Sequence, residues 1–540
     1  MLRSAIRTIP RPSRINVTNC RAFIATPRSL RPSLDTPSAQ STTPLSPSLT
    51  SSPKKAGKNE GTIASVFATL SGGTLEDALP DRFAQLKQSL VSSPSHAEHL
   101  HRTWRDVLSS LNSRVAETSI LGGKCIPEIE FPTASSTAAG ALENWTDAKT
   151  YNAIRERGVA VIRNVIPSKQ VLQWKEEIRA YAKANKAKGF PEDNPQVYEL
   201  YWTQAQLAAR SHPNLLATCE RFLQLFHRPS NAAATDDIIT ACSLGHPLNY
   251  VDRLRIRQPG DAKFALGAHI DGGGVERWEC ENFRGLWHHI LTEAADWQSH
   301  DPWSLGTNGE RMTAKTDMYE GPGQCGVFRP LQGWLSMSNT KAGEGTLKVL
   351  PFLKESTAYI VLRPFFTPIK PESACSNKAE YLADSNWTLD TTSRKFPGCS
   401  LGHNIELSST THPHLDLDNT MTSIPSVTPG DMVLWHCDAV HSVESRHGGK
   451  GDSSVLYIPA IPTTQVNWRY IMQQKQCFDQ GLPPPDFPGG QGESGFQARG
   501  TPHMVKDHVA RASLGLEKLQ AREGADAQET RLVEWCNAQL

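Results

Sequence analysis

The stretch Arg253-Leu-Arg-Ile-Arg-Gln-Pro-Gly-Asp-Ala-Lys-Phe-Ala-Leu-Gly-Ala-His-Ile-Asp-Gly-Gly-Gly274 predicts a strand, a turn and a second strand that ends at His269-Ile-Asp271. Far downstream, Thr428-Pro-Gly-Asp-Met-Val-Leu-Trp-His-Cys-Asp-Ala-Val-His-Ser442 repeats the order of a turn, a short apolar run and a histidine, His441. Alternate residues of a strand share a face, so His269 and Asp271 point the same way if residues 264–271 are extended.

These three side chains have the chemistry of an iron site. Two neutral imidazoles and one carboxylate on one face of Fe(II) leave three positions open, enough for a bidentate co-substrate and O2. The three glycines after Asp271 supply a turn and let the backbone approach a ligand closely. We therefore predict a metal site formed by His269, Asp271 and His441.

The sequence contains two further His-x-Asp triplets. His414-Leu-Asp416 lies in a polar run, which predicts a loop whose His and Asp meet solvent. His436-Cys-Asp438 follows an apolar run, but the histidines after it, His441 and His447, are too close in sequence to come from a distant strand. Only His269 and Asp271 combine a strand end and a glycine turn with a ligand from a remote strand.

Three segments carry a resemblance to a known superfamily: His269 through Trp278, Gly343-Glu-Gly-Thr-Leu-Lys-Val-Leu-Pro351, and Pro429 through Val443. They resemble the iron- and 2-oxoglutarate-dependent dioxygenases, and most closely the YbiU-like family, from about Gly61 to Ala510. The resemblance implies a double-stranded β-helix (a cupin-like jelly roll) and the metal triad on His269, Asp271 and His441. It implies no substrate.

One departure concerns 2-oxoglutarate. Members of the superfamily often place an arginine about ten residues after the distal histidine, where a guanidinium binds the far carboxylate. Here that neighbourhood reads Gly451-Asp-Ser-Ser-Val-Leu-Tyr457, without arginine. The candidate anchors are therefore Arg329, Arg255, Arg446 and Lys450, and the candidate pocket walls are Trp334, Trp435 and Tyr457.

The expected fold class is α+β, a jelly roll with flanking N- and C-terminal helices. We predict a helical region with an entry strand and helix over 61–237, a jelly-roll core over 238–462 with insertions at 275–320 and 371–423, and a C-terminal extension over 463–540. Short apolar runs at turn-marked intervals predict the core strands, including a pair over 345–350 and 359–362. The stripe Val505, Val509, Ala512, Leu516 and Leu519 predicts an amphipathic helix in the extension.

The first part of the chain has the composition of a targeting segment. Seven arginines and no lysine precede Asp35, which predicts a mitochondrial transit peptide over 1–31, then a disordered linker over 32–60 and a matrix location. The alternative is a disordered basic tail. The whole chain carries a net charge of +1, so a body without those arginines is mildly acidic. This composition argues against a nucleic-acid platform.

The cysteines and the apolar runs argue against two further classes, disulfide-stabilised proteins and membrane-spanning proteins. Eleven cysteines without a Cys-x-x-Cys pair predict reduced thiols rather than a disulfide frame. No apolar run approaches the ~20 residues that span a bilayer.

The main hypothesis is an Fe(II)- and 2-oxoglutarate-dependent dioxygenase that oxidises a small molecule with O2. One alternative is a cupin-like metal oxygenase or isomerase without 2-oxoglutarate, which the missing downstream arginine favours. Another is a non-enzymatic mitochondrial binding protein on a degenerate barrel.

Overall fold

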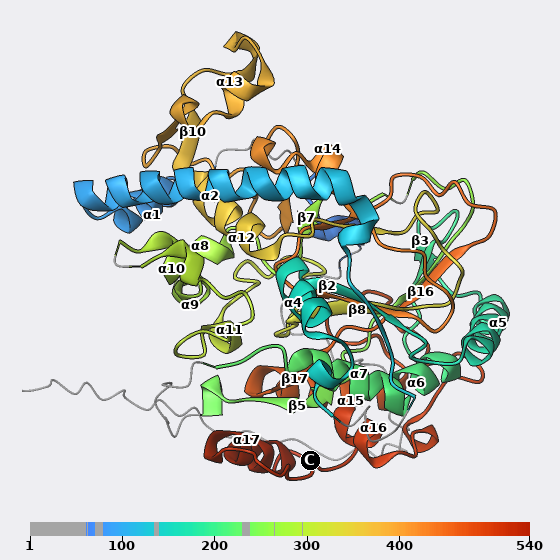
Figure 1. The fold of residues 1–540 in the computed structure, drawn as a ribbon. Helices are drawn as coiled ribbons and strands as arrows, with labels where there is room; N and C mark the ends of the chain where they lie inside the picture. The colour runs from blue at the N-terminus through green and yellow to red at the C-terminus, as the bar shows by residue number, and fades with distance from the viewer. Residues whose placement is uncertain are drawn as a thin grey trace, which may run out of the picture. The chain divides into compact units, whose positions relative to one another are not determined.

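The computed structural model describes residue 61 and residues 63–70, 79–133, 140–228, 238–263, 265–293 and 295–540. All of them belong to one compact unit, Lys55–Leu540. The predicted transit peptide and linker lie outside the described residues. The mixed α+β class is confirmed (Figure 1).

An eight-stranded sheet forms the larger half of the core. Except for the parallel pair of its first two strands, its neighbours are antiparallel. In spatial order its strands are β1 (Glu128–Glu130), β2 (Val159–Arg163), β14 (Met432–His436), β8 (Leu331–Ser336), β16 (Ser453–Tyr457), β6 (Leu254–Arg257), β4 (Val197–Tyr198) and β3 (Gly189–Phe190).

A five-stranded antiparallel sheet forms the smaller half. Its order is β12 (Ile405–Glu406), β7 (His269–Ile270), β15 (His441–Val443), β9 (Leu347–Val349) and β13 (Thr422–Ser423). Two two-stranded sheets pair β10 (Phe366–Pro368) with β11 (Trp387–Leu389), and β17 (Ile461–Thr464) with β5 (Cys242–Leu248). Among the residues described, hydrogen bonding closes neither large sheet into a barrel.

Helices surround the sheets. Those before residue 238 are α1 (Arg82–Leu90), α2 (Pro94–Leu121), α4 (Ala148–Arg157), α5 (Ser168–Ala184), α6 (Gln204–Arg210) and α7 (Pro213–Leu223). Those within the core are α8 (Glu276–Glu279), α9 (Glu281–Gly285), α10 (His288–Leu291), α11 (Glu310–Thr313), α12 (Leu353–Leu362), α13 (Lys378–Leu382) and α14 (Leu417–Thr420). The C-terminal ones are α15 (Gln465–Gln480), α16 (His508–Ser513) and α17 (Ala527–Asn537).

The long helix α2 has clear sequence boundaries. Ser93 accepts a hydrogen bond from the His96 N–H, and Pro94 occupies the first turn, where its missing N–H costs nothing. The helix ends at Gly122, whose φ is +51°. Its apolar face packs on α12, and the Trp104 indole stacks on the Phe366 ring with the ring centroids 4.4 Å apart.

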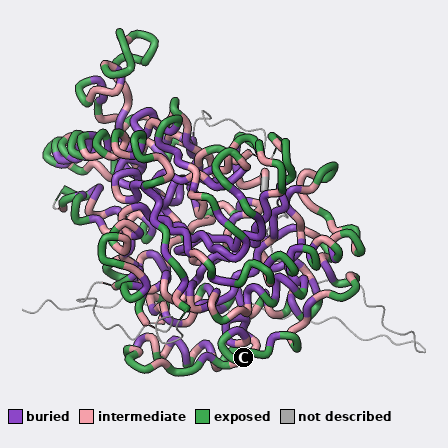
Figure 2. The backbone as a smooth tube through the Cα atoms, turned by 45° about the vertical axis from the view of Figure 1, so that its right-hand side comes forward, coloured by how far each residue is buried: buried purple, intermediate pink, exposed green. Residues whose placement is uncertain are grey.

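Buried residues gather in the interior of the molecule, as the purple segments in Figure 2 show, and α12 is among the most buried elements. This burial explains one wrong prediction. Residues 345–362 contain one strand, β9, followed by the helix α12 rather than by a second strand. Every residue of α12 except Lys354 is buried, so its apolar run carries no helical periodicity that would separate it from a buried strand.

The predicted amphipathic helix of the extension is only partly correct. The helix α16 ends at Ser513 because Gly515 takes a left-handed backbone conformation with φ at +68°. Val509 is exposed, while Leu514 and Leu519 are buried beyond the helix end. No helix in the described part of the chain has the length and apolar character to cross a membrane, and the ten cysteines described there are all free.

Candidate metal centre

The side chains of His269, Asp271 and His441 converge between neighbouring strands of the five-stranded sheet. His269 begins β7, Asp271 follows that strand directly, and His441 begins β15. His269 and His441 are register partners in the antiparallel β7–β15 pair. Directly opposed residues of such a pair place their side chains on one face, so the register brings the two imidazoles together.

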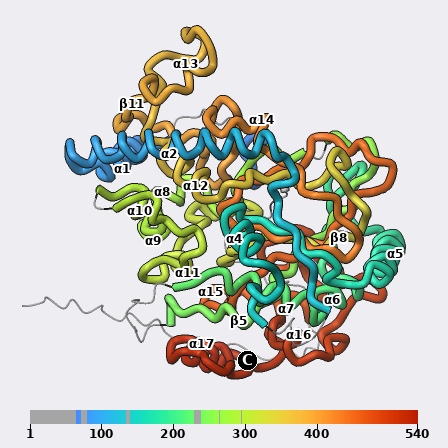
Figure 3. The backbone as a smooth tube through the Cα atoms, viewed as in Figure 1, coloured from blue at the N-terminus to red at the C-terminus, as the bar shows by residue number. Residues whose placement is uncertain are grey.

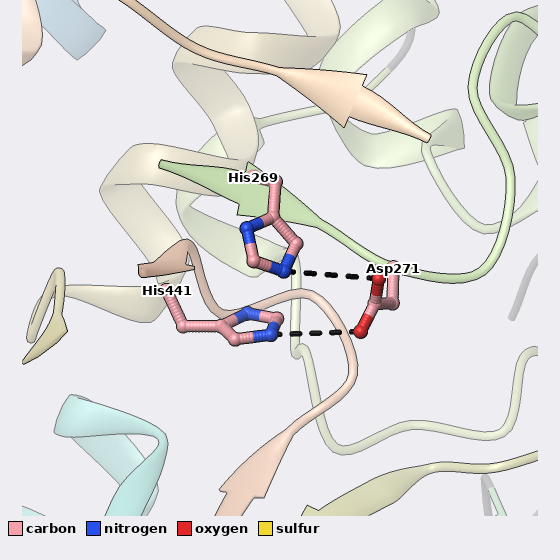
Figure 4. A group of neighbouring side chains, drawn as sticks. All are labelled: His269, Asp271 and His441. Atoms are coloured by element: carbon pink, nitrogen blue, oxygen red, sulfur yellow. Dashed lines mark ion pairs between the residues drawn. The ribbon is translucent and has the colours of Figure 1, made fainter. Parts of the chain in front are cut away.

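Ligand atoms from the three residues lie within 4.8 Å of one another. The His269 Nε2 is 3.8 Å from Asp271 Oδ1, and the His441 Nε2 is 3.5 Å from Asp271 Oδ2 (Figure 4). Figure 4 shows both rings turned toward the carboxylate from the same side. The arrangement is that of three donors around one point.

Hydrogen bonds to the backbone set the tautomer of both rings. The His269 Nδ1 lies 2.7 Å from the Gly267 carbonyl oxygen, and the His441 Nδ1 lies 3.1 Å from the Ala439 carbonyl oxygen. A carbonyl oxygen only accepts, so each Nδ1 carries the hydrogen and donates it. Each Nε2 therefore presents a lone pair toward Asp271, which is the form that binds a metal.

The electrostatics keep the donors in their binding form. Burial, together with the neighbouring His441, lowers the pKa of His269 to about 4, so the ring is neutral at physiological pH. Burial raises the pKa of Asp271, but His441, His269 and Arg329 lower it by more, and the carboxyl is ionised. One carboxylate oxygen accepts a 2.6 Å hydrogen bond from the Asn404 Nδ2, which fixes its orientation.

A cavity of about 170 Å³ lies against this group, between the two large sheets. Four side chains of the larger sheet lie on the face that borders this cavity. Trp334 pairs with Tyr457, and Gln332 pairs with Trp435. Register partners, and alternate residues along one strand, point to the same face of a sheet. All four line the cavity, and three of them are the candidate pocket walls Trp334, Trp435 and Tyr457.

Arg255 also lies on this face and lines the cavity. It sits on β6 directly opposite Val455 of β16. Its side chain is buried, and its Nε has no hydrogen-bond partner. Its Nη2 donates a 3.4 Å hydrogen bond to the Gly345 carbonyl oxygen. Burial lowers the pKa of Arg255, and in the described part of the chain no carboxylate forms an ion pair with it.

The other predicted anchors separate into two groups. Arg329 lines the cavity with its Nη2 3.7 Å from Asp271 Oδ2. Arg446 and Lys450 are exposed and are not among the residues that line it. They lie between β15 and β16.

The other two His-x-Asp pairs are already satisfied. The His436 Nδ1 accepts from the Asp438 N–H, and its Nε2 is 3.0 Å from the Pro302 carbonyl oxygen. The Asp438 carboxylate binds Arg277 and Arg311. His414 is buried rather than solvated, with the Tyr359 hydroxyl 3.1 Å from its Nδ1, so the prediction of a solvent-facing pair was wrong there.

Two residues of the site were missed from the sequence. Asn404 lies in the polar stretch predicted as an insertion, where no pattern marks it. Phe67 packs the edge of its ring on His269, with centroids 4.7 Å apart. The Asn404 N–H donates to the Val66 carbonyl oxygen, so the segment before the first helix is tied to the side chain that orients Asp271.

Comparison with known proteins places this site in a family. The sequence profile described as Gig2-like matches residues 77–516. The chain belongs to the Gig2-like family. It is 28% identical over 458 residues to the uncharacterized protein YbiU of Escherichia coli strain K12, across 82% of this chain and 98% of YbiU. The predicted resemblance to the YbiU-like family is therefore confirmed.

Solved structures agree over most of the chain. The crystal structure of GlcNAc Inducible Gene 2 from Candida albicans is 30% identical, with a TM-score of 0.73 over 86% of this chain and 95% of that one. A hypothetical protein from Escherichia coli is 27% identical, with a TM-score of 0.65 over 82% of this chain and 99% of that one. The Gig2-like fold thus extends through the candidate metal centre.

Proposed function

We propose that this Gig2-like protein is an Fe(II)- and 2-oxoglutarate-dependent dioxygenase that oxidises a small molecule. We further propose that its two facing sheets are the halves of a jelly roll. The observation that carries the proposal is the pair of Nε2 lone pairs on His269 and His441 directed at the same carboxylate. Two imidazoles and one carboxylate suit Fe(II) and leave positions for other ligands.

The residues around the triad fit the metal. Each imidazole donates its second ring hydrogen to a backbone carbonyl, and the Asp271 carboxylate accepts from Asn404. Such partners orient metal ligands and raise their basicity. Iron held there supplies the coupling between oxidative decarboxylation of 2-oxoglutarate, to succinate and CO2, and oxidation of a C–H bond by O2.

Arg255 is the proposed anchor for the far carboxylate of 2-oxoglutarate. A buried guanidinium without a carboxylate partner is costly, and a bound dianion offsets that cost. Arg255 meets this description, whereas Arg329 already lies beside Asp271. The position opposite Val455 also explains why β16 carries no arginine. The guanidinium comes from the adjacent strand.

The chain's own residues then have separate tasks. Arg255 binds and orients the co-substrate, and the Tyr457 hydroxyl lies on the same cavity face as a further donor. Trp334, Trp435 and Leu347 surround the site with apolar surface and exclude water from it.

Spectroscopy of the loaded protein tests this proposal. Purified protein given Fe(II) and 2-oxoglutarate without oxygen should develop a metal-to-ligand charge-transfer band. His269→Ala should lose the band, and His436→Gln, which changes the other buried His-x-Asp pair, should keep it once circular dichroism confirms its fold. A wild-type protein that binds iron without the band on addition of 2-oxoglutarate contradicts the proposal and favours a metal enzyme that does not use this co-substrate. Succinate formed on admission of O2 supports it.

The matrix location remains a separate proposal, supported by the arginine-rich segment before Asp35. Residues 1–60 fused to a fluorescent protein should direct it to mitochondria. A diffuse signal from that fusion contradicts the proposal.

A further inference from the structure

We propose that a second cavity holds the primary substrate, and that this substrate is an organic anion with an apolar body. The inference rests on the proposed function, because it assigns the remaining space at the same centre. The cavity measures about 480 Å³ and shares Asp271, Gly272, Cys325, Arg329 and Gln332 with the cavity described above. We call it the outer chamber.

The outer chamber adjoins the candidate metal centre at Asp271. Its walls come from α9, α11, the loop after α11 and the first turns of α15. Figure 3 shows α9 and α11 next to each other on the same side of the molecule. At about 480 Å³ it has the size of a small-molecule site, whereas the inner cavity of about 170 Å³ suits a compact co-substrate.

The buried part of the chamber is largely apolar. Phe283, Leu286, Met312 and Val327 line it and are nearly inaccessible to solvent. The buried cations in this wall are compensated. Arg277 and Arg311 share the carboxylate of Asp438 at 2.7 and 2.9 Å, and Arg329 lies 3.7 Å from Asp271. The interior therefore accepts a hydrocarbon or aromatic body rather than a second charge.

The solvent end of the chamber carries positive charge. Its exposed side chains are Lys315, Arg469, Val466 and Ile239. Among the described residues, no carboxylate lies within ion-pair distance of Lys315 or Arg469, and the Arg469 guanidinium lies over the Trp535 ring, 5.7 Å from its centroid. The half-buried Asp317 also lines the chamber, and its carboxylate accepts a 2.8 Å hydrogen bond from the Gly321 N–H. Two cations at the mouth and apolar walls behind them favour an amphipathic ligand with its acid group outward.

This polarity has a consequence for the reaction. A ligand whose acid group lies between Lys315 and Arg469 directs its apolar end toward Asp271, at the inner wall. The C–H bond nearest the proposed iron is then on the part of the substrate farthest from its acid group. Carboxylate, sulfonate and phosphate head groups share the chemistry that this mouth recognises.

Two fluorescent probes of one skeleton test the inference on metal-free protein. Anilinonaphthalene sulfonate carries an anion on an aromatic body, and phenylnaphthylamine lacks the charge. The sulfonate should bind with the higher affinity, and added salt should weaken it but not the neutral probe. Decanoate and decyl phosphate should displace the sulfonate more effectively than decanol. The stronger of the two competitors identifies the head group.

Variants at exposed positions locate the binding. The double change Lys315→Gln and Arg469→Gln should weaken sulfonate binding about fivefold and leave phenylnaphthylamine unchanged, because it removes two solvent-exposed charge contacts. Val466→Trp places an indole over the mouth and should weaken both probes. Arg446→Gln, which removes one exposed positive charge outside both cavities, should alter neither.

Equal affinity for the two probes, or sulfonate binding insensitive to the double change, overturns the inference. Neither result depends on iron or 2-oxoglutarate. A protein that forms the charge-transfer band yet fails these probe tests keeps the proposed function and loses this substrate class. A protein that passes them without the band keeps an anion-binding chamber and loses the dioxygenase proposal.

Discussion

Arg255 lies directly opposite Val455 on the strand that follows His441, and its guanidinium lines the same cavity as the three proposed metal ligands. Register partners of an antiparallel pair share a face, so an arginine at either position reaches the same space. The arginine that the superfamily often carries on the strand after the distal histidine can therefore be supplied by β6 instead, and its guanidinium still reaches the same cavity.

Arg255→Gln should weaken 2-oxoglutarate binding roughly 100-fold, because it removes a bidentate charged contact to a carboxylate. Fe(II) affinity should change by less than about twofold, since Arg255 is not a proposed metal ligand. Titration of the charge-transfer band with 2-oxoglutarate measures the first quantity, and Arg446→Gln is the control. The pair Arg255→Val with Val455→Arg should recover part of the affinity. Unchanged affinity in Arg255→Gln would instead assign the anchor to Arg329.

Asn404→Ala should weaken iron binding about tenfold, because it removes the amide that orients the Asp271 carboxylate. Asn419→Ala is a matched control, since its amide in α14 donates a 2.8 Å hydrogen bond to Asp416 at an exposed position. Competition with a colorimetric chelator measures both affinities. Equal losses in the two variants would show that the effect is not local to the site.

The proximity of His269, Asp271 and His441 could be predicted from the sequence because strand alternation and two turn-bounded apolar runs constrain it locally. The residue that anchors 2-oxoglutarate could be narrowed from the sequence only to four candidates, of which Arg255 is one. Its burial depends on which strand pairs with β6, and its pairing with Val455, 200 positions further along the chain, leaves no local signal. Arg446 and Lys450 were plausible by sequence distance alone, yet their turn faces solvent.

The outer chamber could not be predicted at all. Its walls combine short helices of one insertion with the start of α15, and no periodic pattern links these segments. The helix α12 was mistaken for a strand for a related reason. Burial around the whole helix removes the polar face by which a helix is distinguished in sequence.

Asp438→Asn should lower the free energy of unfolding by about 3–5 kcal/mol, because it leaves Arg277 and Arg311 buried with a neutral partner. The Asp438 carboxylate forms an ion pair with each of these two arginines. Burial raises its pKa, but the two guanidinium groups lower it by more. Urea denaturation followed by circular dichroism measures the loss. Asp384→Asn, whose pair with Arg105 is exposed, should cost less than about 1 kcal/mol. A similar small loss in both variants would contradict the structural role given to Asp438.

Glu276 should make the stability depend on pH near neutrality. Burial raises its pKa to about 7, although its carboxylate accepts a 2.8 Å hydrogen bond from the Gly274 N–H. Because the folded pKa lies above the unfolded value, the contribution is fully present below about pH 4.5 and is lost as the pH rises through 7.

The loss can reach about 3 kcal/mol for a shift of this size, at roughly 1.4 kcal/mol for each pH unit between the two pKa values. Glu276→Gln keeps an acceptor for the Gly274 N–H and cannot ionise. The unfolding free energy of the wild type relative to this variant should therefore fall between pH 5 and pH 8, as measured by urea denaturation at each pH. Glu281→Gln, an exposed change in the next helix, should give a flat difference over the same range. A flat difference for Glu276→Gln would mean that its carboxyl is ionised in the folded protein throughout.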